Sequence, residues 1–380
     1  MKKIFVIIFG IIFMLFCVYN VILPPKEFLE NENRYAGKMP EFTLETLLSG
    51  KFTGEYEKFI TDKIALRDFW IFAKSNTEKF SGKKDNNGVY FAKDNYLIDV
   101  FENKNYSDIL DSNISAVNKL AENDRLKVSF ALIPTAYEIL KEKLPPFAYH
   151  PYQQNILEYT EAELKNVAFI NPYEILNENR DKYLYYKTDH HQTAHGSFLV
   201  YNDIMRKMGG LPYSEKDFKI SSVSDEFYGT TWSKTTITIP GDSIIKYEPL
   251  FDVEYNVEYD LNTESDSLYS EKNIATKDKY TYYLDGNHGI TTIRTKLGKQ
   301  NEKHGKKLAV IKDSYAHSII PFLANHYDEI TVFDLRYYNF SVPSYIEEHG
   351  IDEVLFIYNI DNFIEDNNLS KISVYLKNMQ

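Results

Sequence analysis

Two short stretches of this 380-residue chain carry side chains that could do chemistry together. Asp189 and His191 are two residues apart, so on an extended segment they share a face. Ser314 follows an apolar, strand-like run and precedes a helical pattern. A serine, a histidine and an aspartate are the nucleophile, base and orienting acid of acyl-transfer chemistry. The sequence therefore predicts a serine-dependent site if these three side chains meet in space.

Each stretch also has an ordinary structural interpretation. Ser314 or Asp313 could cap a helix, because short polar side chains accept hydrogen bonds from free helix N–H groups. Thr188 or Asp189 could be a turn or cap residue before the helical pattern that starts near Thr193. A strand-to-helix turn at the carboxyl edge of a sheet would instead favour chemistry at Ser314. Ligands bind at that edge, and free N–H groups there could stabilise an oxyanion.

A metal site is a competing interpretation of the histidines. His191 and His195 are four residues apart and could share a helical face, as zinc-binding pairs do. The run from His191 to His195 reads His-Gln-Thr-Ala-His, without the glutamate of the helical metalloprotease motif. Asp189, His191 and His195 could still form a three-ligand site for a metal-dependent hydrolase. The preferred assignment contains no metal and no cofactor.

Apolar strand-like runs alternate with helical patterns along most of the chain. The predicted strands are two short ones within Gly88–Asp99, then Val128–Ile133, Val167–Ile170, Leu308–Ile311, Glu329–Phe333 and Glu353–Tyr358. The predicted helices are Ile109–Ala121, Gln153–Leu164, Thr193–Met208, Tyr315–Asn325 and Pro343–His349. This alternation is typical of an α/β fold with a mostly parallel sheet and helices on both faces.

Residues 220–300 interrupt this alternation. Thr235–Ile239, Phe251–Val257 and Tyr280–Leu284 are strand-like, with Gly and Asp between them. The pattern predicts a β-rich insertion or lid within the α/β domain.

The first 25 residues predict a membrane anchor. Ile4–Leu23 is a run of about twenty apolar residues, which is long enough to span a bilayer. Lys2 and Lys3 favour a cytoplasmic N-terminus and an exported remainder. No small-x-small exit site follows the apolar run, so we expect an uncleaved single-pass anchor, with secretion after cleavage as the alternative. We expect residues 26–84 to be a stalk with a helical lead-in, and residues 85–380 to be the catalytic domain.

Charge and cysteine usage exclude several classes of function. The net charge is −12 and no basic block follows the anchor, which argues against a nucleic-acid partner. Cys17, the only cysteine, lies in the apolar run. The exported part therefore has no disulfide, no thiol nucleophile and no cysteine-based zinc site.

Residues 188–191 resemble the signature of the DHHW proteins, which are membrane-anchored or exported proteins of Gram-positive bacteria. These are relatives of the polysaccharide O-acetyltransferases AlgX and AlgJ, which are SGNH-hydrolase-like. Other stretches similar to the family are Gly88–Leu97, Ile133–Thr135, Phe227–Gly229, Asp285–Asn287 and Lys312–Ala316. The resemblance covers nearly the whole exported part and implies an SGNH-hydrolase-like fold. The acid and base precede the serine, which is the permuted order of the AlgX-like proteins.

The resemblance implies a role for each residue of the candidate site. Ser314 would be the nucleophile, His191 its base and Asp189 the orienting acid. Gln192 stands where DHHW proteins carry tryptophan. That departure leaves the triad chemistry intact but bears on acceptor specificity and on activity.

Three further residues are candidate substrate-binding residues. Asn287 follows a strand-like run and could place an amide donor in a cleft, although such a run is also typical of a turn. Arg336 follows a predicted strand and could clamp an anion, or form a structural salt bridge. Tyr315 directly follows the candidate nucleophile.

The sequence thus predicts an extracytoplasmic enzyme held at the cell membrane by one helix. With a sugar hydroxyl as acceptor it would be an O-acetyltransferase of a cell-surface polysaccharide or exopolysaccharide. With water as acceptor it would be an acetyl esterase that uses the same residues. An exported domain lacks cytoplasmic acetyl-CoA, and the resemblance implies a membrane-bound O-acyltransferase of the MBOAT type as donor partner. A non-catalytic carbohydrate-binding relative is the remaining alternative, motivated by Gln192.

Overall fold

The structure, a computed structural model, describes residues 2–32, 34–101, 107–298 and 305–379. The chain forms two compact units. The smaller unit contains residues 1–87 together with 232–239, and the larger contains residues 88–231 and 240–380.

The larger unit is built on a sheet of eight strands in the order β11-β10-β12-β14-β13-β15-β6-β7. Neighbouring strands from β14 to β7 are parallel, whereas β12, β10 and β11 continue the sheet in antiparallel pairs. The strands are β6 Lys127–Ile133, β7 Val167–Ile170, β10 Val253–Tyr259, β11 Thr263–Ser265, β12 Ile290–Leu297, β13 Lys307–Lys312, β14 Glu329–Phe333 and β15 Glu353–Asn359. The prediction of an α/β fold with a mostly parallel sheet is confirmed.

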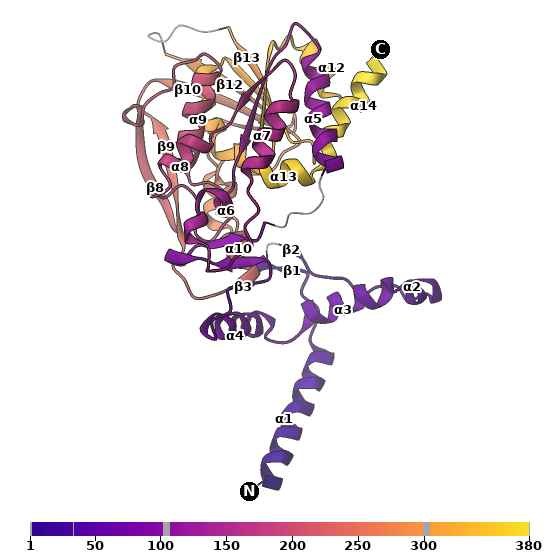
Figure 1. The fold of residues 1–380 in the computed structure, drawn as a ribbon. Coiled ribbons are helices and arrows are strands. Elements are labelled where there is room, and N and C mark those ends of the chain that lie inside the picture. Colours follow the sequence, from indigo (N-terminus) through magenta and orange to yellow (C-terminus); the bar gives the residue numbers. More distant parts are fainter. Residues whose placement is uncertain (1, 33, 102–106, 299–304, 380) are drawn as a thin grey trace. The chain divides into compact units, whose positions relative to one another are not determined.

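The parallel strands are covered on both faces. Every residue after the first is buried in β6, β13 and β15, which explains their nearly continuous apolar sequences. In Figure 1, α5 and α14 lie on one side of the sheet and α9 lies on the other. The helices of this unit are α5 Ser107–Ala121, α6 Ala136–Ile139, α7 Gln154–Glu163, α8 Tyr173–Glu178, α9 Ala194–Lys207, α11 Ile320–Leu323, α12 Val342–Glu348, α13 Ile360–Glu365 and α14 Ser370–Met379.

The predicted β-rich insertion is only partly a separate element. β8 Phe218–Phe227 and β9 Asp242–Pro249 form an antiparallel pair of their own. β10, β11 and β12, by contrast, extend the central sheet. A separate three-stranded sheet contains β4 Val89–Phe91 and β5 Leu97–Asp99, the two short strands that the sequence predicts.

Three predicted elements differ from the structure. The helix over Tyr315–Asn325 is broken into the 3₁₀ turn η7 Ser314–Ser318, α11 and the 3₁₀ turn η8 Ala324–His326. Pro321, which has no N–H group, lies at the start of α11 and so favours a new helix start there. The strand over Tyr280–Leu284 is instead the 3₁₀ turn η6 Lys279–Tyr282.

The third difference is the strand predicted over Thr235–Ile239. Thr235 ends the helix α10 Thr230–Thr235, and Thr236 adopts a left-handed φ of 48°. The backbone N–H of Thr236 donates to the Trp232 carbonyl, and the Trp232 indole N–H donates to the Ile237 carbonyl. These local bonds override the β-branched composition of the segment.

The smaller unit contains α1 Lys2–Ile22, α2 Leu44–Leu48, α3 Lys51–Lys63 and α4 Arg67–Phe80, with the short strands β1 Phe28–Leu29 and β2 Arg34–Tyr35. Among the described residues, one helix is long and apolar enough to cross a membrane, Lys3–Ile22 within α1. This helix is consistent with the predicted anchor or with a signal sequence.

Candidate active site

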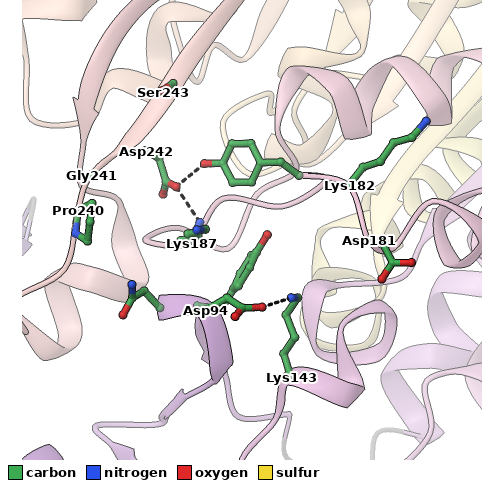
Figure 2. A pocket seen from close by; sticks show the side chains of 12 residues that line it. Asp94, Lys143, Asp181, Lys182, Lys187, Pro240, Gly241, Asp242 and Ser243 are labelled. Carbon is green, nitrogen blue, oxygen red and sulfur yellow. Dashed lines mark hydrogen bonds and ion pairs between the residues drawn. The ribbon is translucent and has the colours of Figure 1, made fainter.

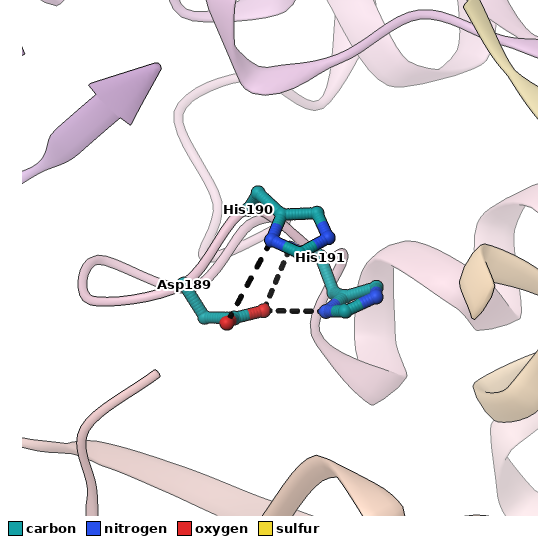
Figure 3. Close-up of side chains that lie close together, drawn as sticks. All are labelled: Asp189, His190 and His191. Atoms are coloured by element: carbon teal, nitrogen blue, oxygen red, sulfur yellow. Dashed lines mark hydrogen bonds and ion pairs between the residues drawn. The ribbon is translucent and has the colours of Figure 1, made fainter. Parts of the chain in front are cut away.

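The structure brings together the three residues that the sequence proposes as a triad. Ser314 Oγ lies 2.8 Å from His191 Nε2, although 123 positions separate the two residues. His191 Nδ1 lies 2.5 Å from Asp189 Oδ1, which also accepts the backbone N–H of His191 at 2.9 Å. Figure 3 shows the Asp189 carboxylate facing both neighbouring imidazoles. The result is an unbroken hydrogen-bonded chain from hydroxyl to imidazole to carboxylate.

Ser314 lies where the carboxyl end of β13 turns into η7. Asp313 is the cap residue of this turn, because its Oδ1 accepts the backbone N–H of Tyr315 at 2.8 Å. Its Oδ2 accepts the backbone and side-chain N–H groups of Asn359 and the side-chain amide of Asn362. Since Asp313 serves as the cap, the Ser314 hydroxyl is left to contact His191.

The charges of the acid and base suit this arrangement. Burial lowers the pKa of His191 to about 4, and the adjacent His190 acts in the same direction, against the attraction of Asp189. Burial opposes ionisation of Asp189, but the two imidazoles and the Thr230 N–H outweigh it and hold the pKa of Asp189 well below its usual range. At neutral pH, Asp189 is therefore ionised and His191 is neutral. An aspartate on Nδ1 favours the tautomer whose Nε2 accepts a proton.

A loop 41 residues away in sequence holds the second oxygen of Asp189. Asp189 Oδ2 accepts the backbone N–H of Thr230 at 2.8 Å and its hydroxyl at 3.0 Å. His190 Nδ1 lies 2.6 Å from the same hydroxyl. Gly229, the preceding residue, packs so closely on Asp189 that no Cβ would fit between them. Phe227–Gly229 is one of the stretches that resemble the DHHW family, and the sequence alone does not indicate its role.

The backbone just before Asp189 is held by a buried carboxylate. Asp242 Oδ2 accepts the backbone N–H of Thr188 at 2.7 Å and its hydroxyl at 2.6 Å, and Oδ1 accepts the Lys187 N–H at 3.0 Å. The Tyr183 hydroxyl donates to Asp242 as well. Asp242 also lines a pocket of about 470 Å³. Figure 2 shows the pairing of Lys143 with Asp94 in this pocket.

Two buried tyrosines contact the His190–His191 segment and the backbone of Ser314. The Tyr280 ring stacks on the His191 imidazole, with ring centroids 3.7 Å apart. Its hydroxyl lies 3.0 Å from both the Ser314 carbonyl oxygen and Ser318 Oγ. The Tyr315 hydroxyl donates to the His190 carbonyl oxygen at 2.5 Å, and this residue is only 1% exposed. The burial of Tyr315 favours a positioning role over the predicted substrate contact.

The two other candidate substrate-binding residues lie together. Arg336 is bonded through two nitrogens to Asp334, at 2.8 and 2.6 Å, and reaches the exposed Asn287 Oδ1 at 3.3 Å. Its positive charge contributes to lowering the pKa of His191, so it acts on the triad electrostatically. Asp334 in turn accepts from the buried Lys312 at 2.9 Å. Arg336 thus takes part in a salt bridge and keeps a partly exposed guanidinium beside Asn287.

The histidines do not form the metal-ligand set that the sequence offers as an alternative. His195 Nδ1 lies 2.9 Å from Glu215 Oε1. In the described parts of the chain, the acidic and imidazole groups close enough to share an ion are Asp189, His190 and His191, with candidate ligand atoms within 4.8 Å of one another (Figure 3). His195 lies outside this group.

Comparison with known proteins places the chain in a family. The sequence model described as "DHHW protein" matches residues 84–333. The chain belongs to the DHHW family. No match was found among the curated proteins.

Two of the solved structures similar to this DHHW protein share its fold, and a third superposes with a TM-score below 0.5. A DHHW family protein from Eubacterium siraeum superposes with a TM-score of 0.66 at 21% identity, over 76% of this chain and 96% of that one. Bacillus cereus PatB1, in a structure with a sulfonyl adduct, superposes with a TM-score of 0.61 at 25% identity, over 74% and 97% of the two chains. The O-acetyltransferase domain of Pseudomonas putida AlgJ gives a TM-score of 0.48 at 13% identity, over 77% and 99%.

Gln192, the departure from the DHHW pattern, is buried next to the triad. It is 1% exposed and lies beside the Tyr185 hydroxyl, which donates to the Pro134 carbonyl oxygen at 2.7 Å. Neither amide atom of Gln192 reaches hydrogen-bonding geometry with a described residue. The backbone pairing of Tyr185 with Gln192 directs this side chain into the protein.

Proposed function

We propose that this DHHW protein is an SGNH-hydrolase-like O-acetyltransferase that acts outside the cytoplasm through a serine acyl-enzyme. The observation that carries the proposal is the chain of short contacts from Ser314 through His191 to Asp189. Its acceptor would be a hydroxyl of a cell-surface polysaccharide or exopolysaccharide.

In the first half-reaction, Ser314 Oγ attacks the acetyl carbonyl carbon while His191 Nε2 takes the hydroxyl proton. Asp189 stabilises the imidazolium that forms. The backbone N–H of Ser314, which makes no hydrogen bond to the described residues, is the first candidate donor to the oxyanion. Collapse of the tetrahedral intermediate transfers the proton from His191 to the leaving group and leaves acetyl-Ser314.

In the second half-reaction, the acceptor hydroxyl gives its proton to His191 Nε2 and attacks the acetyl group. Ser314 Oγ then leaves and regains the proton. Water in place of the sugar hydroxyl makes the same residues an acetyl esterase, so the triad alone does not distinguish the two activities. Arg336 and Asn287 are proposed to bind the substrate beside the triad, with Arg336 oriented by Asp334.

The apolar helix α1 supports transfer rather than hydrolysis. A catalytic unit tethered to the membrane is placed to receive acetyl groups that a membrane protein passes across the bilayer. We therefore propose a membrane-bound O-acyltransferase of the MBOAT type as the donor partner. A soluble esterase would need neither the tether nor the partner.

The experiment measures acetate release from an acetyl ester, and acetyl transfer to added oligosaccharides, by the wild type and by Ser314→Ala. Ser222→Ala, at an exposed serine, is the matched control. We expect Ser314→Ala to abolish both activities, and we expect a chelator to leave the wild type unchanged. A sulfonyl fluoride should modify Ser314, as located by peptide mass spectrometry.

The outcomes separate the candidate functions. Transfer that exceeds hydrolysis identifies a transferase, and release without transfer identifies an esterase. Chelator-sensitive activity that survives Ser314→Ala contradicts the triad. Saccharide binding by a folded protein that shows no turnover and no sulfonyl labelling identifies the non-catalytic relative.

A further inference from the structure

The smaller unit exposes a dense set of large apolar side chains on α3 and α4. The α3–α4 apolar surface consists of Ile60, Ile64, Leu66, Phe69 and Trp70, which are between 37% and 67% exposed. Two of these five, Phe69 and Trp70, are aromatic, and their rings contact each other in the first turn of α4. Exposed apolar patches of this density mark contact with another apolar phase.

The turn between α3 and α4 contacts the last turns of the apolar helix α1. The backbone N–H of Ala65 donates to Asn20 Oδ1 at 2.7 Å, and Lys63 Nζ donates to the Val21 carbonyl oxygen at 3.2 Å. The Trp70 ring meets the Phe16 ring edge to face, with centroids 6.5 Å apart. Asn20 is a polar residue near the end of the apolar helix α1, and its side-chain oxygen accepts a hydrogen bond from the turn between α3 and α4.

If α1 spans a bilayer, these contacts determine how deep in the bilayer the α3–α4 apolar surface lies. Lys3–Ile22 has 20 residues, and at a rise of about 1.5 Å per residue it matches a hydrocarbon core of about 30 Å. Residues 16–22 then occupy the last third of the core. The side chains that contact them lie near the boundary between acyl chains and head groups, where Trp and amphipathic helices accumulate.

The charge distribution agrees with this placement. Residues 2–87 contain 13 Lys and Arg against 11 Asp and Glu, whereas the whole chain has a net charge of −12. The acidic excess therefore lies in the rest of the chain. Lys63 Nζ lies over the Phe59 ring, 5.9 Å from its centroid, and a lysine side chain combines an apolar stem with a charged end, which suits a membrane interface.

We propose that the α3–α4 apolar surface lies in the bilayer interface, against the acyl-chain and head-group boundary of the leaflet where α1 ends. The occupant of the surface is lipid, and α1 is retained in the mature protein, since its last turns bond to Lys63 and Ala65 and contact the Trp70 ring. This inference concerns how the chain meets the membrane and does not depend on the proposed catalytic function. Figure 1 shows α1, α3 and α4, which belong to the smaller unit.

The test uses the full chain in phosphatidylcholine liposomes with lipids brominated at defined depths. Trp232→Phe leaves Trp70 as the only tryptophan, because the chain contains two. We expect Trp70 fluorescence to be quenched most by bromines close to the head group. Absence of quenching at every depth overturns the proposal, and so does quenching that is strongest at the chain ends.

A matched pair on α3 provides the control, in a chain whose own tryptophans are both replaced by Phe. Tyr56→Trp places the reporter on the face of α3 that carries Ile60. Thr61→Trp places it about 140° around the helix, at about 100° per residue. We expect quenching at position 56 and little at position 61. Equal quenching at the two positions overturns the proposal. A surface covered by a protein rather than by lipid leaves position 56 unquenched in pure lipid, and this result overturns it as well.

Discussion

The carboxylate of Asp189 fills the space that a side chain at position 229 would need. A Cβ on Gly229 would lie 2.2 Å from Asp189 Oδ2 and 2.3 Å from Asp189 Cβ. Real Cβ atoms do not approach other atoms so closely, so the acid and this glycine are matched in shape. The next residue, Thr230, donates two hydrogen bonds to Asp189 Oδ2, from its backbone N–H and from its hydroxyl. The absence of a side chain at Gly229 allows these two donors to approach the carboxylate.

Gly229→Ala should therefore displace Asp189 rather than simply fill space. We expect kcat to fall by at least about 10²-fold, because displacing a catalytic group by about 1 Å has effects of this size. We expect the free energy of unfolding to fall by about 1–3 kcal/mol from the overpacking. Ester turnover and thermal denaturation measure the two effects. Gly54→Ala is the matched control, since its Cβ would meet open space within α3 and should leave turnover unchanged. Wild-type turnover in Gly229→Ala would show that the close packing has no catalytic role.

Asp189→Asn tests the acid without removing its volume. An amide cannot hold the Nδ1 proton of His191 as a carboxylate does, so the productive tautomer is lost. We expect kcat to fall by about 10³–10⁴-fold, on the scale seen for such acids elsewhere. Steady-state ester kinetics measure the change. Asp278→Asn is the control, because Asp278 interacts electrostatically with Asp189, whereas the two ring nitrogens of His191 contact Asp189 and Ser314. Comparable losses in both variants would mean that charge near the site, rather than the tautomer, is what matters.

The rate should fall on the acidic side of the pH–rate profile only at an unusually low pH. The proposed mechanism requires neutral His191, and burial lowers the pKa of this residue to about 4. We therefore expect kcat/KM to stay level from neutral pH down to about pH 5 and to fall as the pH drops through about 4. His190→Gln removes the neighbouring imidazole, which contributes to lowering the pKa of His191, so the acidic fall in rate should move to higher pH. Initial rates on a stable ester across pH 3–8 test both shifts. A wild-type limb near the ordinary imidazole value of about 6.5 would contradict the buried base.

Gln192 offers a test of stability next to the triad. Its buried amide lacks hydrogen-bonding geometry with the described residues, and an unsatisfied buried polar group costs about 1–3 kcal/mol. Gln192→Met keeps the volume and removes the amide, so we expect an unchanged or higher free energy of unfolding and near-wild-type turnover. Chemical denaturation measures the first and ester turnover the second. A clear loss of stability would show that the amide has a partner in solution.

The order of strands and helices in the parallel sheet follows from the sequence because each strand is a short, continuous apolar run between polar turns. Two runs with strong β composition, Thr235–Ile239 and Tyr280–Leu284, do not form strands. In η6, the Asp278 carbonyl accepts both the N–H and the hydroxyl of Thr281, which closes a tight turn. Composition does not reveal such local side-chain bonds.

The candidate site was predicted less completely than the sheet. Spacing and family resemblance are enough to name the three residues of the candidate triad. They do not show whether Ser314 or Asp313 caps the turn after β13. That choice depends on Asn359 and Asn362, which bind Asp313 from β15 and α13. The support of Asp189 by Thr230 was also missed, since nothing in one sequence links residues 41 positions apart.

The bonds from Asn359 and Asn362 to Asp313 also set an order of events in the making of the protein. β13, which presents Ser314, pairs with β15 on one side, and the turn after β13 is anchored by residues made some 45 positions later. A chain emerging during synthesis contains Asp189, His191 and Ser314 before it contains β15, which pairs with β13. The hydrogen bonds that hold the turn carrying Ser314 therefore require the chain to extend at least to Asn362.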